Sequence, residues 1–173
     1  MHPTLKPAMA ADASRLISLM REYYAYDRIP FLDQIIGSAL ETLLADSRHG
    51  YAVFITVGGE EIGYVIVTYS FSVEFGGRFA LIDEIFLRDG FRGKGIGQET
   101  IRFLLDRCSR EGIGAVRLEV EMHNIAAQKF YEREGFTRHN RSLMTKWLVD
   151  SSLQRPTGKK PPAPDRSPPP AQP

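Results

Sequence analysis

The segment Arg92-Gly93-Lys94-Gly95-Ile96-Gly97 carries the clearest chemical signal in the sequence. Its three glycines lie within five positions and leave backbone N–H groups free to point into one concavity. The segment follows an apolar run and precedes a helical pattern, so the positive end of the helix dipole adds to these amides. Arg92 and Lys94 place full positive charges beside them. The segment therefore predicts an anion site, most naturally for a pyrophosphate.

Two common phosphate motifs do not fit this segment. A P-loop requires a glycine five residues before its Gly-Lys pair and Ser or Thr after the lysine, but Arg88 and Gly95 occupy those positions. A dinucleotide fingerprint that begins at Gly93 requires glycine or alanine at Gln98, and one that begins at Gly95 meets Thr100. The remaining alternative is a glycine-rich turn that only ends a strand.

Two adjacent carboxylates, Asp83 and Glu84, interrupt the apolar run Ala80–Leu87 just before this segment. A buried central strand has no packing reason to carry charge there. Because consecutive side chains of a strand point to opposite faces, one of the two is expected to face an active-site cleft. The alternative is a solvated or ion-paired carboxylate on a partly exposed strand.

The elements that position these residues alternate as in an α/β or α+β domain. The patterns predict, in chain order, an extended start at Thr4–Lys6, helices over 12–26 and 32–44, strands over 51–57, 62–71 and 79–87, a helix after Gly97, a strand over 115–121, a helix over 124–134, and strands over 136–139 and 143–149. The two strands that flank the helix after Gly97 are expected to form a right-handed parallel crossover.

Composition narrows the class of protein. The chain has 173 residues, 43% of them hydrophobic, and a formal net charge of +1, which indicates one globular domain over residues 1–150. The single cysteine excludes a disulfide framework, and the four histidines show no metal-ligand spacing, so no metal is expected. No apolar run reaches the roughly 20 residues of a membrane span and no export signal is visible, which favours the cytoplasm and no membrane partner.

Residues 151–173 differ from the rest of the chain. Eight of the 11 prolines lie in the 19 residues from Arg155 onward, which predicts a disordered, partly extended tail. The alternative is a proline-rich ligand for a partner protein. This tail carries a net charge of +3, so residues 1–154 carry −2, and a mildly acidic body argues against a nucleic-acid partner.

A family resemblance rests on two motifs. Arg92–Gly97 resembles the Arg/Gln-x-x-Gly-x-Gly/Ala signature of the GNAT superfamily of acetyl-CoA-dependent N-acetyltransferases. The family's Asn…Ala…Phe-Tyr…Gly-Phe pattern is matched by Asn124, Ala127, Phe130, Tyr131, Gly135 and Phe136. The resemblance implies an α/β (α+β) fold with a mixed, mostly antiparallel central sheet, flanking helices and one parallel strand pair around the glycine loop. It also implies acetyl transfer from acetyl-CoA to an amine by direct attack in a ternary complex.

The resemblance assigns expected cofactor contacts. The backbone of Ile85, Phe86 and Leu87 would pair with the amide groups of pantetheine as an added strand does. The loop residues, Arg92, Gly93, Lys94, Gly95, Ile96 and Gly97, would bind the diphosphate of coenzyme A. Asn124 would lie near the coenzyme arm, although asparagine is also among the best helix N-caps.

The same resemblance assigns the chemistry. Tyr131 matches the family's general acid for the departing thiolate, and the alternative is an aromatic side chain that packs beside Phe130. Family members with a dedicated glutamate base have it where this chain has Leu81, so a water relayed through Asp83 or Glu84 is the expected base. Asp83 is favoured because it shares strand parity with Leu81 and Leu87.

The acceptor is the least defined part of this interpretation. The first helix loosely resembles that of diamine and polyamine acetyltransferases, in which an acidic residue after a tyrosine contacts the substrate; Asp27 takes that position. With Asp83 and Glu84 it would suit a polyamine, an aminoglycoside or another small cationic amine. The alternatives are a protein lysine or N-terminus, or a non-catalytic acyl-CoA-binding module.

Cys108 could carry a covalent acyl group, but its place on a core stripe indicates packing. Dimers are common in the resembled family, yet nothing in these residues shows a homodimer.

Overall fold

The structure, a computed structural model, describes residues 2–148. Its centre is a five-stranded sheet with the order β1-β2-β3-β4-β5. The strands are β1 (Thr4–Pro7), β2 (Gly50–Val57), β3 (Glu60–Ser72), β4 (Gly77–Leu87) and β5 (Ala115–Leu118). Neighbouring strands are antiparallel except for β4 and β5, which are parallel. The expected mixed, mostly antiparallel sheet is confirmed.

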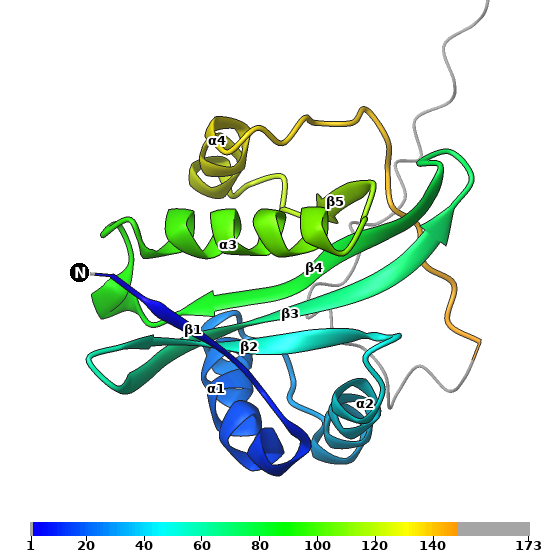
Figure 1. Cartoon of the computed structure of the whole chain (residues 1–173). Helices are drawn as coiled ribbons and strands as arrows, with labels where there is room; N and C mark the ends of the chain where they lie inside the picture. The colour runs from blue at the N-terminus through cyan, green and yellow to red at the C-terminus, as the bar shows by residue number, and fades with distance from the viewer. Residues whose placement is uncertain (1, 149–173) are drawn as a thin grey trace, which may run out of the picture.

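Within the described residues, α-helices cover both faces of this sheet (Figure 1). On one face lie α1 (Ala13–Tyr26) and α2 (Asp33–Ala45), and on the other lie α3 (Ile96–Arg110) and α4 (Ile125–Arg133). Short 3-10 turns, η1 (Ala10–Asp12) and η2 (Asp89–Phe91), precede α1 and the loop that leads to α3. The buried residues of α1 follow helical spacing and are Leu16, Leu19, Met20 and Tyr24.

The sheet divides the hydrophobic core into two parts. Alternate residues of β2 go to opposite faces, so Val53 and Ile55 pack under α3 with Ile101 and Leu104. The intervening Ala52 and Phe54, with Tyr64, Ile66 and Phe86 of the neighbouring strands, pack against α1 and α2. Each fully buried Val, Leu, Ile or Phe contributes roughly 1.5–3 kcal/mol relative to an exposed side chain. Together the two parts fix both helical layers to one sheet.

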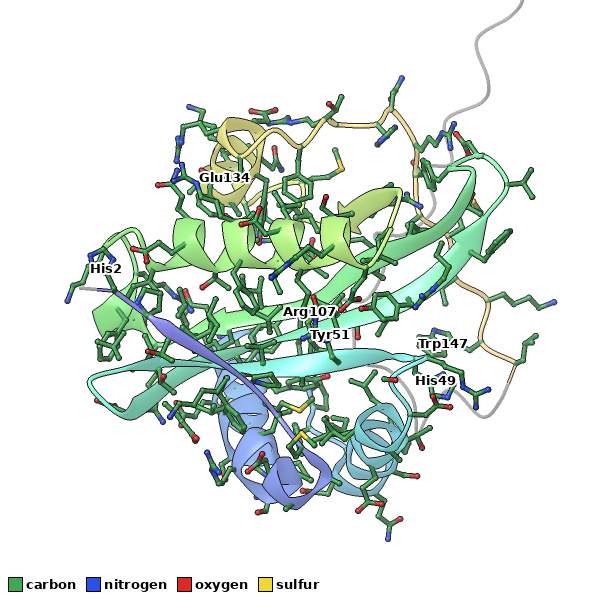
Figure 2. All side chains as sticks on the ribbon, in the orientation of Figure 1. His2, His49, Tyr51, Arg107, Glu134 and Trp147 are labelled. Atoms are coloured by element: carbon green, nitrogen blue, oxygen red, sulfur yellow. The ribbon has the colours of Figure 1, made fainter. Side chains whose placement is uncertain are left out.

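Polar contacts hold α3 and α4 in position (Figure 2). The Arg107 guanidinium of α3 lies 3.5 Å from the centre of the Tyr51 ring on β2, and its Nε donates to Glu111 at 2.8 Å. At the other end of the layer, Gln98 Nε2 donates to Glu134 Oε1 at 2.6 Å. That second contact joins the end of α4 to the first turn of α3.

The two final strands are the main correction to the expected fold. No strand occurs over 136–148, and Val149 and the expected tail over 151–173 lie outside the described residues. Residues 137–142 are all polar, so this stretch has no apolar face to place on a core. Leu143 and Met144, which suggested the last strand, are 74% and 91% exposed. The crossover strand is also shorter than expected and ends at Leu118.

Across residues 2–148, no helix has both the length and the apolar character needed to cross a membrane.

Candidate active site

The site begins where β4 and β5 separate. The parallel pairing runs from Phe79 opposite Ala115 to Ile82 opposite Leu118 and stops there. β4 continues to Leu87, and within the described chain no strand pairs with Asp83–Leu87 on the β5 side. This fork leaves a strand edge whose backbone N–H and C=O groups can bind an extended ligand.

The glycine-rich loop follows this open edge directly. Gly93 and Gly95 have φ angles of 72° and 83°, a left-handed conformation that glycine adopts without strain, and Gly95 is the N-cap of α3. The first bond along α3 runs from Glu99 N to Gly95 O at 3.1 Å. The preceding amides of the helix therefore have no acceptor within it, and residues 92–95 are exposed. Such an end is an anion site.

The two basic side chains of the loop lie differently. Arg92 turns back toward β4, where its Nε donates to Leu87 O at 2.7 Å and its guanidinium pairs with Asp89 at 2.9 Å. It also lies 4.3 Å from the centre of the Tyr26 ring at the end of α1. Lys94 Nζ lies 5.7 Å from the Phe91 ring centre. The structure thus brings both cations to the loop, but the charge of Arg92 is partly neutralised by Asp89.

A β-bulge shapes the acidic part of β4. Ile66 pairs with Glu84 while its neighbour Val67 pairs with Ile82, so Asp83 is an extra residue with no partner of its own on β3. Bulges re-aim side chains, and here the charges of both consecutive carboxylates raise the pKa values of the same two α1 tyrosines, Tyr23 and Tyr24.

The bulge also corrects the parity argument used for Asp83. Leu81 lies between Ala80 and Ile82, which are both in the core under α3, so Leu81 faces the α1 side of the sheet. Leu87 packs against the core under α3. The expectation that Leu81 and Leu87 share a face is therefore wrong, because the extra residue between them reverses the alternation.

Glu84 is held by two tyrosines that sequence reasoning missed. Its carboxylate accepts hydrogen bonds from the Tyr24 hydroxyl of α1 at 2.8 Å and from the Tyr64 hydroxyl of β3 at 2.7 Å. Burial raises the pKa of Glu84, and the two tyrosine hydrogen bonds oppose that rise. Both tyrosines resemble core aromatics in the sequence. The only signal was that a hydroxyl in a core position requires a partner, which an adjacent strand with a carboxylate supplies.

Asp83 and Asp27 lie around the same tyrosines. Asp83 is exposed, yet the surrounding protein desolvates it enough to raise its pKa. The pKa of Tyr23 is raised by burial and then by the charges of Asp27, Glu84 and Asp83. All three carboxylates that the sequence assigned to the acceptor side are therefore close enough to Tyr23 to raise its pKa.

The two predicted residues of the second motif lie on the opposite face. Tyr131 of α4 packs edge-on against Phe130 and Phe136, with ring centres 5.0 and 5.7 Å away. Burial raises the pKa of Tyr131, which keeps its hydroxyl protonated. Asn124 caps α4, since its Oδ1 accepts from Ala127 N at 3.1 Å. That bond uses only the carbonyl half of the Asn124 amide.

Cys108 is a core residue. It is 1% exposed within the layer under α3, and burial raises the pKa of its thiol. The packing interpretation is confirmed, because a buried thiol with a raised pKa is a poor nucleophile.

Comparison with known proteins identifies this arrangement. A model of the acetyltransferase (GNAT) family matches residues 14–136. The chain belongs to the GNAT acetyltransferase family. Acetyl-CoA is the acetyl donor of GNAT enzymes, and the fork, glycine-rich loop and α4 motif all lie within the matched region.

Three proteins are similar to this chain over part or most of its length. The chain is 30% identical over 95 residues to an L-methionine sulfoximine/L-methionine sulfone acetyltransferase of Pseudomonas paraeruginosa, covering 53% of this chain and 54% of the relative. It is 37% identical over 94 residues to a streptothricin acetyltransferase of Streptomyces lavendulae, covering 53% and 46%. The matches thus span about half the length of these relatives. An integron cassette protein from the Cole Harbour Salt Marsh metagenome superimposes with a TM-score of 0.75 at 28% identity, covering 84% of this chain and 90% of that one.

Proposed function

We propose that this GNAT protein transfers the acetyl group of acetyl-CoA to a primary amine of a small acceptor by direct attack in a ternary complex. The observation that carries this proposal is the fork between β4 and β5, which opens directly onto the glycine-rich loop. Its unpaired edge at Ile85, Phe86 and Leu87 suits the amides of pantetheine, and the amides from Gly93 to Gly97 suit the diphosphate. Asn124 is then near the coenzyme arm.

The acceptor enters from the α1 and α2 face. An alkyl ammonium has a pKa near 10 and must lose a proton before its nitrogen can attack. Asp83 takes that proton, directly or through water, because its raised pKa makes it a stronger base than an ordinary aspartate. We assign Glu84 a positioning role, since hydrogen bonds from two tyrosine hydroxyls hold its carboxylate in place and oppose the rise of its pKa. It fixes the bulge and adds negative potential that attracts the cation.

The thiol leaves on the other face. The amine nitrogen bonds to the thioester carbonyl carbon, the carbon–sulfur bond breaks, and its electron pair stays on sulfur. Tyr131 donates a proton to that thiolate from the α4 side. The nitrogen loses its second proton as the amide forms, and that proton restores Tyr131 through solvent, while the proton that Asp83 gained is released to solvent. Both groups must reach the same tetrahedral carbon, so they act across the fork, where β4 and β5 are no longer paired.

Two observations support a small cationic acceptor. Asp27, Asp83 and Glu84 gather negative charge beside the aromatic rings of α1, and such rings also attract cations. The names of the two curated relatives describe acetylation of small molecules. A polyamine and an aminoglycoside both belong to this class.

The test is calorimetry followed by a thiol-release screen. Acetyl-CoA is titrated into the protein, and thiol release is then measured with polyamines, aminoglycosides, amino acids and basic peptides. We expect binding and amine-dependent release with small acceptors. Absence of binding at millimolar acetyl-CoA overturns the proposal. Binding without release across the whole panel overturns catalysis and favours an acyl-CoA-binding module, and release with peptides alone favours a protein acceptor.

A further inference from the structure

Asp83 has no register partner on either side of β4 within the described chain. On the β3 side it is the extra residue of the bulge, because Ile82 and Glu84 pair with consecutive residues of that strand. On the β5 side the parallel pairing ends one residue earlier, where Ile82 lies opposite Leu118. The bulge and the fork therefore coincide at Asp83, and strand pairing constrains this residue less than it constrains its neighbours.

The two neighbours of Asp83 are held in different ways. Ile82 has a partner on each side, Val67 on β3 and Leu118 on β5, and it is buried in the core under α3. Glu84 lies beyond the fork, so its one strand partner in the described chain is on β3. Further support for Glu84 must therefore come from its side chain.

Two tyrosine hydroxyls supply that support. The Tyr24 hydroxyl donates to Glu84 Oε1 at 2.8 Å and the Tyr64 hydroxyl donates to Oε2 at 2.7 Å, so each oxygen has its own donor. Hydrogen bonds to an ionised acceptor are stronger than those between neutral groups. The three side chains, Tyr24 of α1, Tyr64 of β3 and Glu84 of β4, form a tyrosine clamp that joins the helix and both strands next to the bulge.

The two rings of the tyrosine clamp are fixed by packing. Tyr64 is 0% exposed and Tyr24 is 7% exposed. The Tyr24 ring lies edge-on to Phe31 with ring centres 5.1 Å apart, and the Tyr64 ring centre lies 6.0 Å from that of Phe86. A buried hydroxyl requires a hydrogen-bond partner, and in this core Glu84 is the partner of both. The clamp is thus anchored in the core on the α1 side of the sheet.

We propose that Tyr24 and Tyr64 are positioning residues of acetyl transfer, which hold Asp83 toward the acceptor amine by fixing the carboxylate of its neighbour Glu84. The proposal deepens the acetyl transfer proposed above and rests on it. Both hydroxyls are directed to Glu84, so the tyrosines act through Asp83 and not on the acceptor itself. If the bulge moved by about 1 Å, Asp83 would lose its hydrogen bond to the ammonium, and a misplacement of that size can lower a rate about 100-fold.

The first experiment removes one hydroxyl at a time. Tyr24→Phe and Tyr64→Phe keep the buried rings and remove only the hydrogen bonds to Glu84. With the best acceptor of the thiol-release screen, we expect kcat to fall about 10- to 100-fold and the Kd for acetyl-CoA to stay unchanged. The matched control is Tyr69→Phe, which removes a tyrosine–glutamate hydrogen bond, to Glu111, on the α3 side of the sheet and should keep the native kcat.

The second experiment repeats Tyr24→Phe in the Asp83→Asn background. The base is already absent there, so the added substitution should lower kcat by less than about twofold more. A general loss of structure would lower kcat by the same factor in both backgrounds. If the effect of Tyr24→Phe keeps its full size in Asp83→Asn, the tyrosine does not act through Asp83 and the proposal is wrong.

Substitutions of Glu84 separate position from charge. Glu84→Ala removes the acceptor of both hydroxyls and should lower kcat as far as the tyrosine variants do. The amide in Glu84→Gln can accept from one hydroxyl and donate to the other once that hydroxyl rotates, so it should restore much of the kcat lost in Glu84→Ala. It should still raise the KM of a cationic acceptor, because the negative charge is gone. Equal kcat losses in the two variants would mean that Glu84 acts through its charge, and the proposal would be wrong.

Thermal melts establish that each variant is folded, and the tyrosine and glutamate substitutions test the clamp independently if one of them does not fold. Native kcat in both folded tyrosine variants of an active protein overturns the role of the clamp alone. If the native protein releases no thiol with any amine, acetyl transfer and the role of the clamp both fail.

Discussion

Substitution of Gly95 tests the anion site at the level of the backbone. Gly95 has a φ of 83° and a ψ of −12°, and an added Cβ would meet no atom within 4 Å. Gly95→Ala therefore introduces no clash and only the cost of holding an L-residue in a left-handed conformation, about 1–2 kcal/mol. For a domain of about 150 residues this lowers Tm by roughly 2–8 °C.

The same cost should appear in acetyl-CoA binding. If the free loop relaxes to relieve the strain, the strained conformation must be restored when the diphosphate binds. Kd should then rise by up to 1–2 kcal/mol, which is about 5- to 30-fold, and whatever part of the strain the free loop relieves is missing from the Tm shift of the free variant. The assay is calorimetry of acetyl-CoA with each folded variant, alongside a thermal melt.

Gly112 provides a matched control. It follows the other end of α3, has a φ of 69°, and an added Cβ there also meets no atom within 4 Å. Gly112→Ala should lower Tm by a similar amount but leave Kd unchanged. If the Gly95 and Gly112 variants bind acetyl-CoA equally well, the amides between Arg92 and Gly97 do not hold the diphosphate, and the reasoning fails.

Three further substitutions test the chemistry. Tyr131→Phe keeps the edge-on packing but removes the acid, so kcat should fall about 100-fold with an unchanged Kd for acetyl-CoA; unaltered kcat would remove Tyr131 from the mechanism. In the native protein, kcat/KM should fall as the pH drops through the pKa of Asp83. Burial raises that pKa, so the fall should occur above the usual aspartate value of 3.8. Asp83→Asn should abolish this decrease of kcat/KM at low pH, the acid limb of the profile. A limb that persists in the asparagine variant belongs to another group. Cys108→Ala should leave turnover within about twofold, because the thiol is buried away from solvent, whereas a hundredfold loss would revive covalent transfer.

The parts of the fold that depend on local pattern were predictable from the sequence. The helix after Gly97 was expected from its helical pattern and is α3, and the strands expected over 51–57 and 62–71 are β2 and β3, joined by a turn at Gly58-Gly59. Asn124 was expected to begin a helix and caps α4. In each case the signal is local, because a helical stripe marks a helix and only a few residue types suit a left-handed turn or an N-cap.

The parts that depend on pairing between strands were not predictable. The bulge at Asp83 exists only relative to β3, since it is defined by where Ile66 and Val67 find their partners. For the same reason the sequence could not show that Tyr24 and Tyr64 would meet at Glu84. The last expected strands failed because residues 137–142 have no apolar face to place on a core, and the apolar Leu143 and Met144 that follow stay exposed.

The open edge of β4 has a consequence for handling the protein. Unpaired strand edges are templates on which other chains add, and this one carries the apolar side chains of Ile85 and Leu87. Because acetyl-CoA is proposed to bind along this edge of β4, the edge would be exposed only while no coenzyme is bound. Preparations depleted of coenzyme should therefore self-associate more readily than loaded ones, so the nucleotide would act as a solubilising agent as well as a reactant.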